Sequence, residues 1–185
     1  IHEEIGTGVW VSRQYFDPAA PIVDAIAPRG PLAASLEILT ACGLGEPRLW
    51  LRRFDDLSVG EKFRAQLARA VGSAQLTSKP KPIFCDEFSS HLHRRLAKAI
   101  AYNLRKLVTR RGLMLFVTTA HDDICDDLQA DQNIRLGGQP PSSIELRPSD
   151  RACTLRKNLK IEAGTLGDYH SFSPMHYRRQ DKLGF

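Results

Sequence analysis

Three polar side chains stand where two apolar runs of the chain end. Asp86 and Glu87 directly follow the apolar residues 82–85, and His121 closely follows the apolar residues 113–119. If both runs are strands of one α/β sheet, their carboxyl ends meet at the same edge, where such sheets bind ligands. Carboxylates and an imidazole at this edge are typical of a metal or catalytic site. Taken singly, they are also compatible with an acidic pair at a helix start and a polar residue at a strand end.

Residues 57–61, with the sequence Leu-Ser-Val-Gly-Glu, precede a helical pattern. Ser58 and Glu61 have the spacing of a capping box, in which each side chain accepts a hydrogen bond from a free backbone N–H. Gly60 has no Cβ, so an anion such as a phosphate could approach the positive end of the helix closely. An ordinary capped amphipathic helix is the alternative. The apolar residues that define this helix are Phe63, Leu67 and Val71.

The elements that must position these groups form a strand, helix, strand unit. A long helix over residues 91–111, ended by Gly112, separates the two apolar runs. A right-handed crossover makes the two strands parallel, so the predicted fold class is α/β. The apolar residues expected on one face of the long helix are Leu92, Leu96, Ile100, Leu104 and Val108.

Shorter elements flank this unit. Upstream we expect a strand over residues 8–13 that ends at Gln14, a helical turn over residues 22–26, and a helix between Pro31 and Gly43. Leu32, Leu36 and Leu39 are expected on one face of that helix. The remaining expectations are a polar connection over residues 46–56, a polar loop over residues 77–81, and a hairpin with strands at 134–136 and 144–147.

Composition and charge exclude several classes. Of the 185 residues, 42% are hydrophobic and 25% charged, as in globular domains. Neither a signal peptide nor an apolar run of about 20 residues, the length that crosses a bilayer, occurs. We therefore expect a cytoplasmic protein, with docking on a membrane partner left open. The net charge of +5 favours a solvated basic face or linker over a DNA-reading surface. The four scattered cysteines favour reduced, partly buried thiols.

In this order, the motifs resemble the nucleotide-binding domain of ATP-binding cassette (ABC) ATPases. Gln14 matches the family's Q-loop glutamine, and residues 57–61 resemble its signature motif Leu-Ser-Gly-Gly-Gln. Residues 83–87 look like Walker B with its catalytic glutamate, and residues 119–121 like the histidine switch. The resemblance covers roughly residues 1–145. Its D-loop residues are Ser89, Ser90 and Leu92.

The resemblance implies an α/β fold of the P-loop NTPase type, with a mostly parallel sheet flanked by helices and a helical subdomain. It implies ATP hydrolysis with Mg²⁺, which Asp86 and Gln14 would contact. Glu87 would orient or deprotonate the attacking water, and His121 would contact the γ-phosphate. Two such domains sandwich ATP head to tail. The residues that would bind a partner's nucleotide are therefore Leu57, Ser58, Gly60 and Glu61.

The sequence departs from the family's pattern at three points. Val59 replaces a signature glycine, and His93 stands where an aspartate is usual in the D-loop. No G-x-x-x-x-G-K-[ST] occurs, so a P-loop that cradles phosphate is missing. Because Ile1 is not Met and little sequence precedes Gln14, we expect a truncated chain that is inactive alone. The rival interpretation is a degenerate scaffold or regulatory domain without nucleotide chemistry.

The expected organisation has four parts: the end of a core lobe with the Q-loop (1–14), a helical and signature subdomain (15–75), an ATPase core (76–147), and a basic linker or the start of a further domain (148–185). Residues 164–170 weakly resemble the junction to an acetyltransferase-like (GNAT) domain in some ABC-type ATPases, and a disordered basic linker is the alternative. The expected partners are ATP, a second copy or another ABC-type domain, and either a fused acetyltransferase-like domain or a transporter subunit.

Overall fold

The computed structural model describes residues 8–75, 80–136 and 142–146, together with residues 165 and 167. The expected loop at 77–81, the hairpin turn and the segment 164–170 therefore lie wholly or mostly outside the described residues. A compact unit ends at Arg147, and all elements below belong to it. Within the described ranges, no helix is long and apolar enough to cross a membrane.

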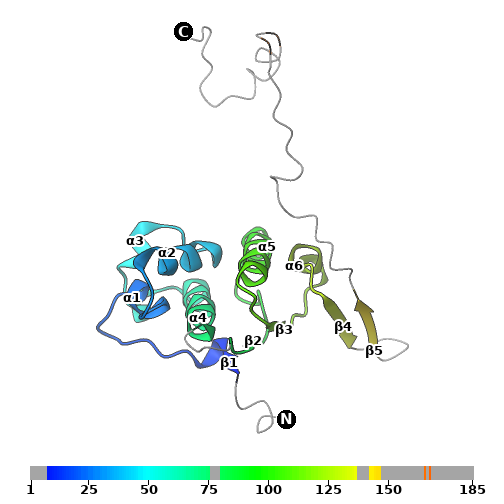
Figure 1. Ribbon diagram of the computed structural model, residues 1–185, viewed down its shortest axis with the longest axis horizontal. Helices are drawn as coiled ribbons and strands as arrows, with labels where there is room; N and C mark the ends of the chain where they lie inside the picture. Colours follow the sequence, from blue (N-terminus) through cyan, green and yellow to red (C-terminus); the bar gives the residue numbers. More distant parts are fainter. Residues whose placement is uncertain (1–7, 76–79, 137–141, 147–164, 166, 168–185) are drawn as a thin grey trace. The chain divides into compact units, whose positions relative to one another are not determined.

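The chain alternates short strands with helices of very different lengths (Figure 1). The elements are β1 (Val9–Trp10), η1 (Val11–Arg13), α1 (Ile22–Ile26), α2 (Leu32–Ala41), α3 (Pro47–Trp50), η2 (Phe54–Asp56), α4 (Val59–Ala74), β2 (Ile83–Cys85), α5 (Arg94–Arg110), β3 (Leu115–Val117), η3 (Asp122–Ile124), α6 (Cys125–Leu128), β4 (Gln132–Leu136) and β5 (Ser142–Leu146).

The central sheet has three parallel strands in the order β1, β2, β3. Ile83 pairs with Val9 on one side and with Leu115 on the other. The connection from β2 through α5 to β3 is the predicted unit, and its strands are parallel as expected. The carboxyl ends of β2 and β3 therefore lie side by side, which brings the residues after Cys85 and Val117 to one edge.

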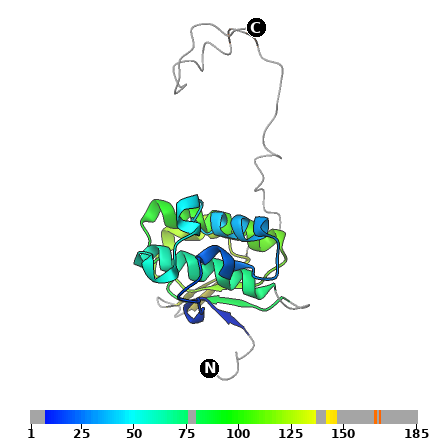
Figure 2. The same ribbon diagram turned by 90° about the vertical axis from the view of Figure 1, so that its left-hand side faces the viewer.

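The two faces of the sheet differ in burial because side chains alternate along a strand. Ile83 and Cys85 are buried, whereas Phe84 between them is half-buried. Phe84 stacks between Trp10 and Phe116, with ring centroids 4.9 and 5.1 Å apart, so one aromatic row crosses all three strands. Figures 1 and 2 show α1, α2, α4 and α5 together on one side of the strands.

Helix α4 confirms the predicted capping box. The Glu61 amide donates to Ser58 Oγ (3.4 Å), and the Ser58 amide donates to Glu61 Oε2 (2.8 Å). The helix then presents its apolar side to the core, and it packs against α1, α2 and β1. The three residues predicted to face the core are all buried: Phe63, Leu67 and Val71.

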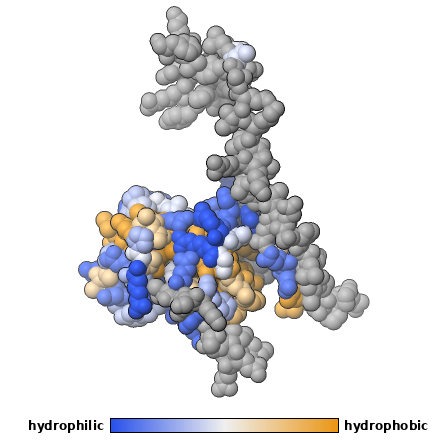
Figure 3. Space-filling view, viewed as in Figure 1, coloured by the Kyte–Doolittle hydropathy of each residue, from blue (hydrophilic) through white to orange (hydrophobic). Residues whose placement is uncertain are grey.

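Helix α5 begins at Arg94, three residues later than predicted, because residues 86–93 form a series of turns. Its end at Gly112, which has a φ of 61°, is as expected. The apolar face is buried and the opposite face is polar, and Figure 3 shows hydrophilic side chains gathered over α5. The exposed polar residues of this helix are Arg95, Lys98, Asn103, Thr109 and Arg110.

Other predicted elements need correction. The strand expected over residues 8–13 is only β1, because the chain turns into η1 before Gln14. Leu32 is 62% exposed because it lies at the first position of α2, before the helix reaches the core. The polar connection expected over residues 46–56 contains α3 and η2. The strand expected over residues 113–119 is the shorter β3, whereas the turn α1 and the hairpin of β4 and β5 are confirmed.

Candidate functional site

The turn after β2 carries unusual backbone conformations. Glu87 and Ser89 have positive φ values of 50° and 74°, a region that non-glycine residues rarely adopt. Between them, the fully buried ring of Phe88 packs edge-on against Phe63 of α4. Strained conformations of this kind persist only where the surroundings hold them, and they cluster at functional sites.

Two threonines after β3 hold this turn. Thr118 Oγ1 donates to Asp86 Oδ1 and accepts from the Glu87 amide (3.0 Å), while the Thr118 carbonyl accepts from the Phe88 amide (2.8 Å). Thr119 Oγ1 donates to the Phe88 carbonyl (3.2 Å). The sequence placed Thr119 in the motif that resembles the histidine switch but did not predict that either threonine holds the turn after β2. Their position between β3 and His121 was the signal that could have identified them.

These contacts bring several predicted residues around one pocket. Its volume is about 410 Å³, and it lies beyond the carboxyl ends of β2 and β3. Glu87 and Ser90 line it from the turn after β2 and His121 from the loop after β3, so three of the residues singled out from the sequence meet here. Asp86 is not part of the lining, but it is exposed and bonded to Thr118. The complete lining is Glu87, Phe88, Ser90, Thr118, Thr119, Ala120 and His121.

The donors beside the pocket suit a hydrated Mg²⁺ ion better than a metal held by protein alone. No group of three His, Cys, Asp or Glu side chains that could hold a metal occurs within the described residues. Mg²⁺ normally keeps several waters and uses one or two carboxylates together with substrate phosphates. The exposed carboxylate of Asp86 fits this role. The preceding Cys85 is 2% exposed and does not line the pocket.

The start of α4 does not line this pocket but packs on the segment that follows its lining residue Ser90. A Cβ on Gly60 would lie 3.1 Å from the His91 carbonyl oxygen, so the signature-like turn packs directly against the D-loop-like segment. Arg64 fixes this turn by donating to the carbonyl oxygens of Gly60 (3.0 Å) and Gly43 (2.5 Å). None of residues 57–61 lines the pocket that contains Glu87.

Gln14 is likewise separate from the pocket. Its Nε2 donates to the Trp10 carbonyl (2.6 Å), and its Oε1 accepts from Ser73 Oγ (3.5 Å) at the far end of α4. The side chain therefore folds back on β1 and α4. A contact between Gln14 and a metal at Asp86 would require this amide to turn.

Solved structures share the fold of this chain. Two dimeric structures of MJ0796, one described as an ATP-binding cassette bound to ADP and Pi and the other as a bacterial ABC transporter cassette, match with a TM-score of 0.54. They cover 69% of this chain and are 21% and 22% identical to it. The fold is that of an ATP-binding cassette. The chain spans 57% of the length of the chains it matches.

A sequence relative agrees with the cassette fold. Over 90 residues the chain is 38% identical to the lipoprotein-releasing system ATP-binding protein LolD of Syntrophotalea carbinolica. The match covers 49% of this chain and 36% of the relative. No family model matches the chain. The solved structures therefore show the cassette fold, and the relative is an ATP-binding protein by its name.

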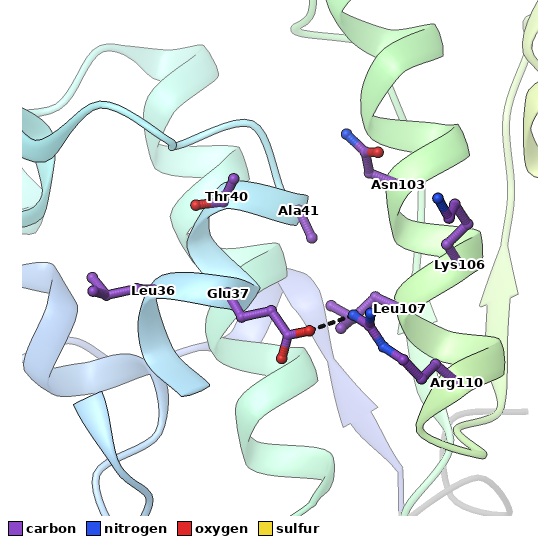
Figure 4. Close-up of a pocket in the computed structure, with 8 residues that line it drawn as sticks. All are labelled: Leu36, Glu37, Thr40, Ala41, Asn103, Lys106, Leu107 and Arg110. Atoms are coloured by element: carbon purple, nitrogen blue, oxygen red, sulfur yellow. Dashed lines mark hydrogen bonds and ion pairs between the residues drawn. The ribbon is translucent and has the colours of Figure 1, made fainter. Parts of the chain in front are cut away.

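A second hollow of the cassette, of about 460 Å³, lies between α2 and α5 (Figure 4). The Glu37 carboxylate reaches across it to Arg110 and also pairs with Arg111, which donates to Gln75 (2.6 Å). The hollow is larger than the Glu87 pocket, yet its carboxylate is already engaged by two cations. We therefore interpret these ion pairs as a link between helices.

Glu61 gives the cassette a pH-dependent contribution to stability. Hydrogen bonds from Ser58 hold the pKa of the Glu61 carboxyl below its ordinary value. Its contribution is therefore fully present above the unfolded-state pKa and is lost as the pH falls through the lowered folded pKa. We expect Glu61→Gln to lower the free energy of unfolding at neutral pH, and wild type and variant to converge below the lowered pKa. Urea unfolding across this pH range measures the difference.

Two variants control this experiment. Ser58→Ala removes the cap itself and should cost about 1 kcal/mol. Glu46→Gln removes an exposed carboxylate, 58% accessible and paired with Arg48, and should change stability little at any pH. A constant difference between wild type and Glu61→Gln across the whole pH range contradicts the assignment.

Proposed function

We propose that this chain contributes the hydrolytic half of an ABC-type ATP site. The observation that carries the proposal is the meeting of Glu87, Ser90 and His121 around one pocket, with Asp86 at its edge. Phosphoryl transfer needs mainly positioning and charge stabilisation, so a carboxylate, an imidazole and hydroxyl groups around one pocket suit it.

Each residue has a role in this proposal. Asp86, with Gln14 after its amide turns, holds Mg²⁺, which supplies charge neutralisation for the β- and γ-phosphates when bound. Glu87 orients a water and accepts its proton as the water oxygen bonds to the γ-phosphorus and the ADP oxygen leaves. His121 donates a hydrogen bond to the γ-phosphate. Ser89, Ser90 and Leu92 form the D-loop beside this site.

The signature turn serves a second copy in this proposal. Leu57, Ser58, Gly60 and Glu61 lie outside the pocket lining, and Val59 is 65% exposed at the start of α4. A helix start that does not line its own hydrolytic pocket can offer N–H groups to a phosphate bound by another domain. We therefore propose a head-to-tail dimer with shared sites.

A P-loop must come from other residues, because these 185 contain no G-x-x-x-x-G-K-[ST]. We call this chain together with the residues that supply a P-loop the ATPase assembly. The isolated chain should neither hydrolyse ATP nor bind it tightly. The exposed Val59 in place of glycine favours one alternative, a scaffold domain without nucleotide chemistry. We propose that ATP hydrolysis drives a partner polypeptide, such as a transporter subunit.

Complementation between two variants tests the shared site. Val59→Asp puts a negative charge where the partner's phosphate would approach, while an acidic residue at this position suits the helix start. Glu87→Gln removes the base from the other half. Each variant alone should be inactive, but mixing them creates dimers with one intact site. We expect roughly a quarter of wild-type phosphate release after complete subunit exchange.

The matched control is Val59→Asn, which has the size of the aspartate without its charge. It should keep most of the turnover of the ATPase assembly. A mixture no more active than the sum of its parts contradicts the shared site. Inactivity of the wild-type ATPase assembly supports the scaffold instead.

A further inference from the structure

Arg94 occupies an electrostatically unfavourable place. It is the first residue of α5, and no acidic side chain lies in the first turn of this helix. The amino end of a helix carries partial positive charge, so a cation there is disfavoured. An arginine at this position needs a compensating contact from elsewhere in the fold.

The compensation comes from the two loops that flank the Glu87 pocket. Arg94 donates to both carboxylate oxygens of Asp123, with Nε 3.2 Å from Oδ2 and Nη2 bonded to Oδ1. Its remaining nitrogen, Nη1, donates to Ser89 Oγ (3.4 Å). Lys98, one turn further along α5, adds a second cation 3.7 Å from Asp123 Oδ2. One guanidinium thus joins η3 to the turn after β2.

Both partners are close to the groups proposed for chemistry. Asp123 is two residues beyond His121, which directly precedes η3. Ser89 is 1% exposed, lies between Glu87 and Ser90, and has a φ of 74°. Neither Arg94 nor Asp123 lines the pocket. Their contact can therefore act on the pocket by fixing the relative positions of the two loops that line it.

We propose that Arg94, through Asp123 and Ser89, is a positioning residue that holds the Glu87 turn and the His121 loop in register. A bidentate guanidinium contact defines orientation as well as distance, which a single ammonium does not. The pair is partly exposed, 37% for Arg94 and 47% for Asp123, so salt should weaken it. Its consequence for turnover rests on the proposed ATPase function, whereas its effect on the loops does not.

Hydrogen exchange of backbone amides in the full chain tests the positioning role directly. The amides to follow are those of Ser90, bonded to the Glu87 carbonyl (3.1 Å), and His121, bonded to Thr119 Oγ1 (3.1 Å). In R94Q both should exchange about tenfold faster, while the amide of the buried Leu104 in α5 should be unchanged. D123N should accelerate the same two amides, and the double variant should be no faster than R94Q.

Two further variants sharpen the result. Arg95→Gln removes the neighbouring exposed arginine and should leave all three amides unchanged. R94K keeps the positive charge but loses the planar guanidinium that donates to both Asp123 oxygens, so it should behave like R94Q. Unchanged loop amides in R94Q, equal acceleration at Leu104, or full rescue by R94K would overturn the proposal.

Kinetics of the ATPase assembly separate this inference from the function on which it rests. R94Q should lower kcat about tenfold with KM for ATP within about twofold, because misplaced catalytic groups slow chemistry more than binding. No hydrolysis by the wild-type assembly would remove the proposed function but leave the exchange result standing. Accelerated loop amides with unchanged kcat would overturn the catalytic part of the inference.

Discussion

Glu87→Gln should reduce ATP hydrolysis by the ATPase assembly by at least about a hundredfold, the lower range for loss of a general base. Glu87 lines the pocket from the turn after β2, together with His121 from the loop after β3. Glutamine keeps the size and a hydrogen-bonding oxygen but cannot accept the proton of water. Steady-state phosphate release measures the loss.

Binding should survive this substitution. ATP affinity should stay within about threefold, because Glu87 is proposed to act on water and not on the phosphates. A nucleotide-bound dimer should then accumulate, and size-exclusion chromatography with ATP detects it. Glu46→Gln is the matched control, since Glu46 is exposed and does not line the pocket. Retention of more than half of the wild-type rate by Glu87→Gln refutes the assigned role.

The predictable part of this site follows from local pattern and one topological rule. Ser58 and Glu61 cap α4 because their spacing alone determines which amides they reach. The meeting of Glu87 and His121 follows because each comes after a strand of the same parallel unit. Neither prediction required knowledge of how helices pack on the sheet.

The unpredicted part depends on contacts distant in sequence. Thr118 bonds to Asp86 and Glu87 across the strand ends, and Arg94 bonds to Asp123, 29 positions away. Helix α5 also starts later than predicted because the turn before it is held by these contacts between distant residues. Ser89 has a positive φ although it is neither glycine nor asparagine, so its residue type gives no signal of this conformation. Neighbouring loops hold it in place.

Gly72 shows how packing can reverse a local expectation. It lies inside α4, where glycine normally costs about 0.5 to 1 kcal/mol relative to alanine. Helix propensity alone therefore favours alanine over glycine at position 72. In the structure, a Cβ at this position would overlap the carbonyl oxygen of Ile26 and lie 2.9 Å from its carbonyl carbon. Ile26 is fully buried at the end of α1, so backbone would have to move.

We therefore expect Gly72→Ala to lower the free energy of unfolding by about 3 kcal/mol, the upper range for overpacking. The thermal midpoint should fall by about 10 °C, and calorimetry or circular dichroism measures it. Gly30→Ala is the matched control, because its Cβ would meet nothing closer than 3.5 Å. An unchanged or raised midpoint for Gly72→Ala contradicts the close packing of α1 on α4.

The same substitution tests whether α4 links Gln14, at one end of the helix, to the Ser58 cap at its other end. Ser73, the next residue, donates to Gln14, while the opposite end of α4 carries the Ser58 cap. Arg69 also donates to the Ala25 carbonyl, so α1 and Gln14 are both anchored on the last turns of α4. If α1 is pushed away, the Gln14 contact should loosen while the cap stays intact. Gly72→Ala should therefore accelerate amide exchange in α1 and near Gln14, but leave the Glu61 amide unchanged.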